Sequence, residues 1–306
     1  MYTDAITPDL LRRSVIAVPP LARNQDLSIN PQANRTMIQH LEAGGITNIL
    51  YGGNANFYHI APSEYAEALH MLQDNTGTDT WVIPSAGPTF GVMIDQARIL
   101  REFAFPTAMV LPMSGLMTFD GVEEGFKRFV DAYGKPAVLY IKSEDYITPS
   151  AAGRLVKEGY VSAIKYALVT PDPAIDPFLE ALLQHADPRY IVSGIGEQPA
   201  ITHLTQFKLT GFTAGCVCVA PKLSMSLLRA LDEGRVEDAD AIRERFKPLE
   251  DLRNSINPVR VLHQAITLSG IADMGPALPL ISLLSDDKAS DLQAAVKELM
   301  NHEAAI

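Results

Sequence analysis

The sequence predicts a (β/α)8 barrel followed by a helical region, and three observations support this fold class. Short apolar runs alternate eight times with segments of helical spacing within about 220 residues. The connections are short, and no glycine-rich phosphate fingerprint follows the first run, which disfavours a doubly wound sheet. From about Gly234 onward only helical periodicity remains. We therefore expect a barrel over residues 1–233 and a C-terminal helical region over 234–306.

The expected strands are short and rich in β-branched or aromatic residues, whereas the segments between them have helical spacing. Gly44 and Gly45 stop the first helix, and Pro62 is placed in the first turn of the second. The expected strands are 14–19, 47–51, 81–84, 107–111, 137–141, 161–168, 190–193 and 212–217. The expected barrel helices are 31–42, 62–73, 92–103, 121–133, 149–157, 176–185, 199–208 and 222–232. Three more helices, 236–254, 258–268 and 288–301, make up the C-terminal region.

Composition excludes several classes of function. The 306 residues contain 25 Lys and Arg against 36 Asp and Glu, a formal charge of −11, which argues against nucleic-acid or anionic-membrane partners. No run is long enough to span a membrane, and the N-terminus lacks a signal pattern, so a cytoplasmic enzyme is expected. Cys216 and Cys218 alternate along the last expected strand, a poor arrangement for a disulfide. The seven histidines, among them His59, show no metal-ligand spacing, so no metal site is expected.

One charge interrupts an otherwise apolar strand. Residues 161–168 read V-S-A-I-K-Y-A-L, and a desolvated ammonium at Lys165 is costly unless it is paired or loses its proton. A lysine with a lowered pKa can attack a carbonyl and form a Schiff base. The alternative is a lysine at the strand end whose ammonium reaches water or a carboxylate.

Other candidate groups fall at the carboxyl ends of the strands, where barrel enzymes place their active sites. Tyr140 ends the strand before that of Lys165, residues 52–56 follow the second strand, and Gly194 and Glu197 follow the seventh. An amine, a phenol that shuttles protons and backbone N–H groups that hold a carboxylate suit chemistry on a 2-keto acid. Tyr140 could instead simply line the barrel, and the loop at 52–56 could be a plain tight turn.

The chain resembles the dihydrodipicolinate synthase / N-acetylneuraminate lyase family of class I aldolases over nearly its whole length. The most specific segments are G-K-P-A-V-L-Y (134–140), A-I-K-Y-A (163–167), S-G-I-G-E (193–197) and G-F-T-A-G-C-V-C-V-A-P-K-L (211–223). The resemblance implies a barrel with C-terminal helices, assembled as a homotetramer (a dimer of dimers), that needs no cofactor. It implies that Lys165 forms the Schiff base and Tyr140 shuttles protons. It also places the carboxylate-binding loop at Gly52, Gly53 and Asn54, and a backbone contact to pyruvate at Thr213.

Three departures separate the chain from a true dihydrodipicolinate synthase. Gly53 and Asn54 stand where the synthase has paired threonines, so one relay hydroxyl is missing. No tyrosine occurs near Met113, where the synthase lends one across its dimer interface. The segment after Tyr140, I-K-S-E-D-Y, lacks the arginine that grips the second carboxylate of the synthase's substrate. Lys142 could replace that arginine as a carboxylate anchor, or could simply be an exposed loop residue.

The remaining features point to sugar-acid substrates. The loop G-G-N-A-N-F-Y resembles that of the 5-dehydro-4-deoxyglucarate dehydratases, and Glu197 falls where neuraminate lyases hold sugar hydroxyls, although Cys218 replaces an asparagine common in these subgroups. We expect a divergent class I lyase that cleaves or dehydrates a 2-keto acid, either pyruvate-yielding or sugar-derived. The alternatives are a pyruvate condensation of the dihydrodipicolinate type and a non-catalytic barrel that binds keto acids.

Overall fold

Eight parallel strands close into a barrel in which every strand pairs with its neighbours in sequence, and β1 pairs with β8. The computed structural model describes residues 1–306. The strands are β1 (Ile16–Ala17), β2 (Asn48–Tyr51), β3 (Trp81–Ala86), β4 (Met109–Val110), β5 (Ala137–Ile141), β6 (Val161–Tyr166), β7 (Ile191–Ser193) and β8 (Gly211–Ala214). Nearly every strand residue is buried, as expected for parallel strands covered by helices. The predicted (β/α)8 barrel is confirmed.

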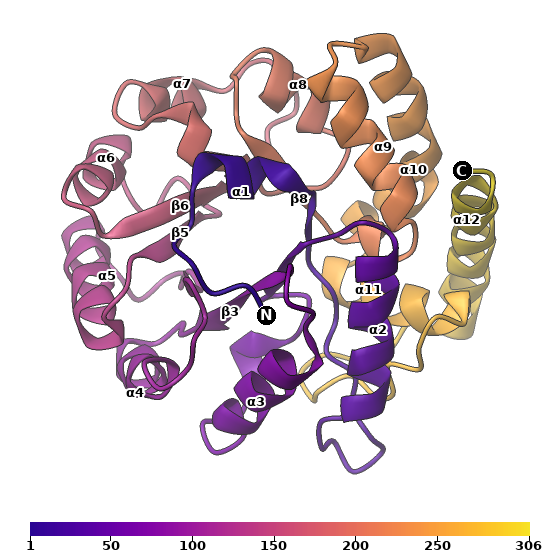
Figure 1. Ribbon diagram of the computed structural model, residues 1–306, viewed down its shortest axis with the longest axis horizontal. Coiled ribbons are helices and arrows are strands. Elements are labelled where there is room, and N and C mark those ends of the chain that lie inside the picture. Colours follow the sequence, from indigo (N-terminus) through magenta and orange to yellow (C-terminus); the bar gives the residue numbers. More distant parts are fainter.

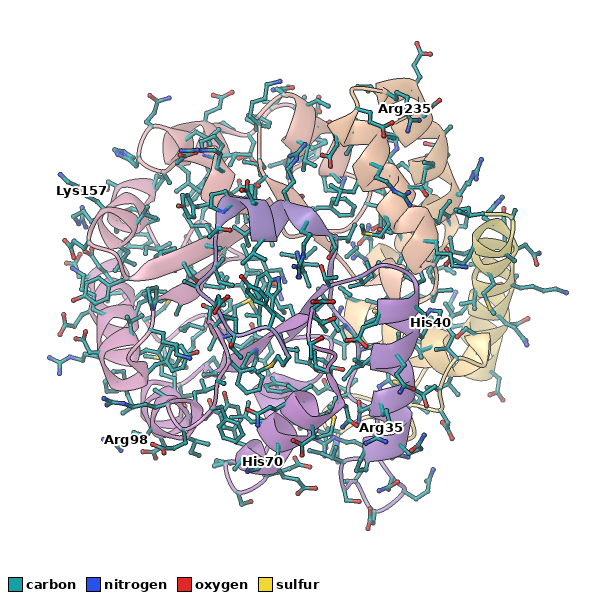
Figure 2. All side chains as sticks on the ribbon, viewed as in Figure 1. Arg35, His40, His70, Arg98, Lys157 and Arg235 are labelled. Atoms are coloured by element: carbon teal, nitrogen blue, oxygen red, sulfur yellow. The ribbon has the colours of Figure 1, made fainter.

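A ring of helices surrounds the barrel in the order of the sequence (Figure 1). It consists of α2 (Pro31–Ala43), α3 (Tyr65–Asn75), α4 (Phe90–Leu100), α5 (Phe119–Tyr133), α6 (Pro149–Lys157), α7 (Pro177–Leu183), α8 (Ala200–Thr205) and α9 (Pro221–Asp232). Several of these helices begin with a proline in the first turn and an Asn, Asp or Thr side chain that caps it, as in α2, α6 and α7. Figure 2 shows the charged side chains Arg98, Lys157 and Arg235 pointing outward from this ring.

The last three helices gather on one side of the barrel, beside α9 (Figure 1). They are α10 (Val236–Ser255), α11 (Pro258–Ser269) and α12 (Asp286–Ala304). The apolar face of α10 carries Phe246 and Leu249, but it also buries two charged residues, Glu250 and Arg253. None of the helices combines the length and apolar character needed to cross a membrane. The division at residues 233/234 coincides with the turn between α9 and α10 and stays a prediction.

Three details of the predicted secondary structure are wrong. A short helix, α1 (Pro8–Arg13), lies across one opening of the barrel (Figure 1), and its signals, the Thr7 cap and Pro8, were overlooked. Helix α3 begins at Tyr65 rather than at Pro62, because a turn ending at Glu64, which pairs with buried Arg23, precedes it. The eighth strand ends at Ala214.

Cys216 and Cys218 therefore do not lie on a strand. They form a short 3-10 turn, where both are free and buried. The chain leaves the strand at Gly215, where an added Cβ would lie 2.2 Å from Cδ1 of Leu262 on α11. Packing of the C-terminal helices against the carboxyl end of β8 thus causes the difference from the predicted strand.

Candidate active site

Lys165 and Tyr140 face each other across adjacent strands. They are register partners on β6 and β5, and Nζ of Lys165 lies 4.1 Å from the centroid of the Tyr140 ring. Both residues are buried, and Nζ contacts the face of the ring rather than the hydroxyl. Neither Nζ nor the Tyr140 hydroxyl makes a hydrogen bond to another protein group. The two groups are therefore available to a reacting molecule.

Burial sets the protonation of this pair. Burial, together with the smaller effect of the positive charges of Lys142 and Arg253, lowers the pKa of Lys165 from 10.5 to about 7. Burial also raises the pKa of Tyr140 to about 12, an effect that Arg253 opposes. Near neutral pH, a large share of Lys165 is thus the nucleophilic free amine, while Tyr140 keeps its proton.

The lowered pKa predicts unusual reactivity of Lys165 toward acetic anhydride. Its acetylation rate should rise with pH to a half-maximum near pH 7, because only the neutral amine reacts, and the exposed Lys157 is followed in the same samples for comparison. Replacing Lys142 with methionine removes a charge that disfavours the ammonium, so the midpoint for Lys165 should move to higher pH. Peptide mass spectrometry across pH 6–10 measures both rates. Parallel profiles for Lys165 and Lys157 would contradict the lowered pKa.

The loop after β2 presents unpaired backbone donors. The amide groups of Gly53, Asn54 and Ala55 donate no hydrogen bond within the protein, although the loop is closed by Asn56 donating to the carbonyl of Gly53. The Asn54 side chain donates to the carbonyl of Val18 at 3.0 Å and so ties this loop to the end of β1. Consecutive free amide groups of this kind suit a carboxylate. The predicted Gly52–Asn54 segment therefore has the donors required of it.

The loop after β7 passes close to Lys165. A Cβ at Gly194 would lie 3.1 Å from Cγ of Lys165 and 2.7 Å from the carbonyl oxygen of Tyr166. At Gly196 the backbone has φ +106, and an added Cβ would lie 2.0 Å from a carboxylate oxygen of Glu250. Glycine is required at both positions, because a side chain would collide with a neighbouring strand or with α10.

Glu197 faces the helices α9 and α10. It is fully buried, its Oε1 accepts a hydrogen bond from Ser224 on α9, and its backbone N–H donates to Glu250 on α10. Burial, and then the charge of Glu250, raise the pKa of Glu197 well above its usual range. The structure therefore gives Glu197 partners on α9 and α10.

Three groups able to bind metal ions meet at this point. Ligand atoms of Glu197, Glu250 and Cys216 lie within 4.8 Å of one another. Arg253 already places a positive charge beside Glu250, with 3.7 Å between Nη2 and Oε1. Burial also raises the pKa of the Cys216 thiol, which disfavours the thiolate that a metal would need. This arrangement favours a proton on Glu197 over a metal ion.

The other predicted site residues lie around the same end of the barrel. The carbonyl oxygen of Thr213 on β8 accepts a hydrogen bond from the N–H of Gly196 at 3.1 Å. Lys142 follows the last residue of β5 and is exposed, yet its charge acts on Lys165. His59 lies at the end of the β2 loop and is exposed.

Sequence reasoning assigned no role to Arg253 or Tyr146, although it proposed that Tyr58 shapes the pocket or packs against the barrel rim. The hydroxyl of Tyr58 donates to the carbonyl of Pro112, and after burial the neighbouring phenols of Tyr140 and buried Tyr146 raise the pKa of Tyr58. The sequence contains an indication of Arg253, because its spacing places it on the same face of α10 as Phe246 and Leu249. A charged residue on an otherwise apolar helix face is unusual.

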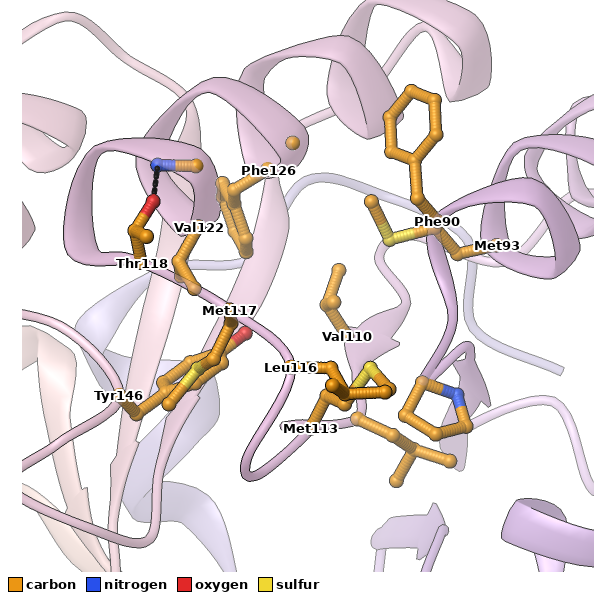
Figure 3. A pocket seen from close by; sticks show the side chains of 14 residues that line it. Phe90, Met93, Val110, Met113, Leu116, Met117, Thr118, Val122, Phe126 and Tyr146 are labelled. Carbon is orange, nitrogen blue, oxygen red and sulfur yellow. Dashed lines mark hydrogen bonds between the residues drawn. The ribbon is translucent and has the colours of Figure 1, made fainter.

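A separate apolar cavity of about 480 Å³ opens between α4 and α5. Phe90 and Met93 lie on one side of it, and Met117 and Tyr146 on the other (Figure 3). Lys165 does not line this cavity, although Tyr146 connects its wall to the surroundings of Tyr140. The titratable pair, rather than this apolar cavity, therefore marks the candidate reaction site.

Comparison with known proteins gives consistent matches. The model of the dihydrodipicolinate synthetase family matches residues 12–299. A 4-hydroxy-tetrahydrodipicolinate synthase of Chlorobaculum parvum is 23% identical, over 90% of this chain and 93% of its own. A protein of the dihydrodipicolinic acid synthase family from E. coli K12, solved in complex with pyruvate, superposes with a TM-score of 0.83 at 18% identity, covering 94% of this chain and 99% of its own. A sialic acid aldolase of Ruminococcus gnavus also gives a TM-score of 0.83, at 15% identity and with 96% and 99% coverage.

Proposed function

The chain belongs to the dihydrodipicolinate synthetase family, and from this premise we propose that it is a class I lyase acting on a 2-keto acid. Lys165 forms an imine with the substrate and Tyr140 transfers protons. The observation that carries the proposal is the buried amine with a pKa of about 7, held 4.1 Å from the Tyr140 ring. Such a lysine supplies an uncharged nucleophile at neutral pH without a second base to activate it.

The residues of the site fit successive steps of this chemistry. The free amide groups at Gly53, Asn54 and Ala55 bind the C1 carboxylate, which places C2 before Nζ of Lys165. Nζ attacks C2, and the carbonyl oxygen leaves as water after accepting protons. The resulting iminium draws the electrons of the C3–C4 bond, or those freed by removal of a C3 proton. In the first route the C4 hydroxyl loses its proton, C4 departs as an aldehyde, and the enamine left on Lys165 takes up a proton at C3. In the second route the C4 hydroxyl takes up a proton and leaves as water. Hydrolysis of the remaining imine then releases the product and the free amine of Lys165.

Two kinds of reaction are compatible with family membership. The Chlorobaculum parvum relative is named for a synthase reaction, so pyruvate condensation is the second candidate. Against it stand Asn54 in place of a relay hydroxyl and the missing tyrosine near Met113. We therefore propose cleavage or dehydration of a sugar-acid-type substrate as the principal activity. A keto-acid-binding barrel without catalysis is the outcome in which no imine forms.

Borohydride trapping tests the proposal directly. The wild type incubated with pyruvate and sodium borohydride should gain the mass of one reduced pyruvate adduct per chain, located at Lys165 by peptide mapping. Lys165→Ala should gain none, while Lys157→Ala, which removes an exposed lysine on α6, should be labelled like the wild type. If neither pyruvate nor longer 2-keto sugar acids label the wild type, the lyase proposal fails.

We further propose that the chain assembles as a homotetramer, a dimer of dimers. Exposed apolar side chains support this: Leu116 and Phe90 border the cavity between α4 and α5, and Val169 and Ile175 lie beyond the end of β6. Two separate apolar patches are what two kinds of subunit contact require. Light scattering should give four times the chain mass of 33.3 kDa, and Leu116→Glu should reduce that mass. A monomeric wild type would exclude the assembly.

A further inference from the structure

Arg253 brings a nearly buried positive charge from the C-terminal region to the mouth of the barrel. It lies on α10, and only 7% of the residue is exposed. Its Nη2 donates to the carbonyl of Ile195 in the β7 loop at 2.5 Å and to the Asn254 side chain at 3.0 Å. A guanidinium withdrawn from water in this way needs a compensating negative charge.

Groups of the protein accept hydrogen bonds from only some of the nitrogens of this guanidinium. Nη1 makes no hydrogen bond to another protein group, and the ion pair with a carboxylate is long, with 3.7 Å between Nη2 and Oε1 of Glu250. Glu250 is itself engaged, since its two oxygens accept hydrogen bonds from the backbone N–H groups of Glu197 and Gln198. One edge of the guanidinium thus remains free to bind an anion.

Arg253 and Lys165 flank the same short loop. A Cβ at Gly194 would lie 3.1 Å from Cγ of Lys165, and a Cβ at Gly196 would lie 3.1 Å from both Nη1 and Nη2 of Arg253. Only Ile195 therefore separates the position that contacts Lys165 from the position that contacts the guanidinium. The charge of Arg253 accordingly acts on both Lys165 and Tyr140.

We propose that Arg253 binds a second carboxylate at the far end of the substrate, so that the preferred substrates are 2-oxo dicarboxylates. The inference rests on the proposed imine chemistry and adds to it the class of substrate. The C1 carboxylate occupies the amide groups at 53–55, C2 meets Lys165, and the distal carboxylate meets Nη1 of Arg253 beyond the β7 loop. The arginine that the synthase carries after its catalytic tyrosine is thus replaced from α10.

Arg253 suits this role better than the other nearby cation, Lys142. Lys142 is exposed after the end of β5, where water screens its charge, whereas Arg253 is withdrawn from water. The planar guanidinium can also bind a carboxylate with two parallel hydrogen bonds, which an ammonium cannot. Binding at Arg253 should therefore discriminate strongly between a dicarboxylate and a monocarboxylate of equal length.

The test compares borohydride trapping of 2-oxoadipate and 2-oxohexanoate, which differ in the distal carboxylate. The ratio of their half-saturating concentrations is measured at pH 7 for the wild type, Arg253→Gln, Arg253→Lys and Lys142→Gln. In the wild type the dicarboxylate should be favoured about tenfold or more, the loss expected for a missing charged hydrogen bond. Arg253→Gln should bring the ratio of the two concentrations close to one. Arg253→Lys should keep part of the preference for the dicarboxylate, and Lys142→Gln should keep all of it. The ratio cancels any change in the pKa of Lys165 caused by removing a charge.

Each result bears on one proposal. If the wild type traps pyruvate but shows no preference between the two probes, the assignment of Arg253 is overturned and the lyase proposal stands. Loss of the preference in Lys142→Gln but not in Arg253→Gln would also overturn it, and would assign the anchor to Lys142. If no keto acid is trapped at all, the imine proposal fails first. Should Arg253→Gln not fold, the wild-type ratio and its decrease with salt still decide whether a distal anion is bound.

Discussion

Replacing Lys165 with methionine is expected to stabilise the fold at pH 7 by about 2–4 kcal/mol while abolishing imine formation. The wild type must bury an amine whose pKa falls from 10.5 in the unfolded chain to about 7 in the folded one. Methionine has similar length, carries no charge and can pack against the Tyr140 ring. The midpoint of thermal unfolding should rise by roughly 4 °C or more. Under the proposed function, Lys165 is thus a position where the chain gives up stability for reactivity.

The pH dependence of this gain identifies its cause. Between pH 7 and 10.5 the unfolded wild type binds more protons at this position than the folded one does, so wild-type stability rises with pH. The advantage of Lys165→Met should be complete at and below pH 7 and should shrink by about 1.4 kcal/mol per pH unit above it. Denaturant unfolding of both proteins at pH 7, 8 and 9 measures the difference.

A matched control separates this effect from a general preference for methionine. Lys157 is exposed on α6, so Lys157→Met should change the free energy of unfolding by less than about 0.5 kcal/mol and should show no dependence on pH. An equal gain in both variants, or a gain at Lys165 that stays constant up to pH 9, would contradict the buried amine.

Local sequence patterns were sufficient for the barrel and for the reactive pair. Apolar runs that alternate with helical segments predicted all eight strands, and β5 was predicted with its observed bounds. This was possible because a buried parallel strand consists of one continuous apolar segment. Lys165 could be identified because a single charge within such a segment is conspicuous. Tyr140 could be predicted to lie beside Lys165, because the two residues end strands that are neighbours in a barrel.

Side chains that reach the site from distant segments of the sequence could not be predicted from local patterns. Arg253 lies 88 residues after Lys165 on a helix of the C-terminal region, and nothing local to its sequence shows that the helix turns toward the β7 loop. The same applies to Glu197, whose partners Ser224 and Glu250 come from two other helices. The 3-10 turn at Cys216 depends on the position of Leu262, which only the packed fold reveals. Periodicity predicts elements, whereas contacts between elements decide these details.

Replacing Tyr140 with phenylalanine is expected to reduce turnover about 10²- to 10⁴-fold while leaving Lys165 able to form the imine. The substitution removes the hydroxyl but keeps the ring that Nζ faces at 4.1 Å, so the surroundings of the amine change little. The hydroxyl, with a pKa of about 12, is protonated at neutral pH and is thereby suited to donate a proton to a departing oxygen. Its loss should slow the steps after substrate binding, and kcat should fall more than KM changes.

Two measurements on the same variant test this division of roles. Borohydride trapping with pyruvate should still label Tyr140→Phe at Lys165. Turnover of a 2-keto sugar acid that the wild type cleaves or dehydrates should fall about 10²- to 10⁴-fold. Tyr146→Phe is the matched control, because Tyr146 is also a buried phenol with a raised pKa but lines the apolar cavity instead of facing Lys165. A decrease of less than tenfold in Tyr140→Phe, or an equal decrease in Tyr146→Phe, would assign the proton transfer to another group. Loss of trapping as well as turnover would mean that the hydroxyl is already needed to expel water during imine formation.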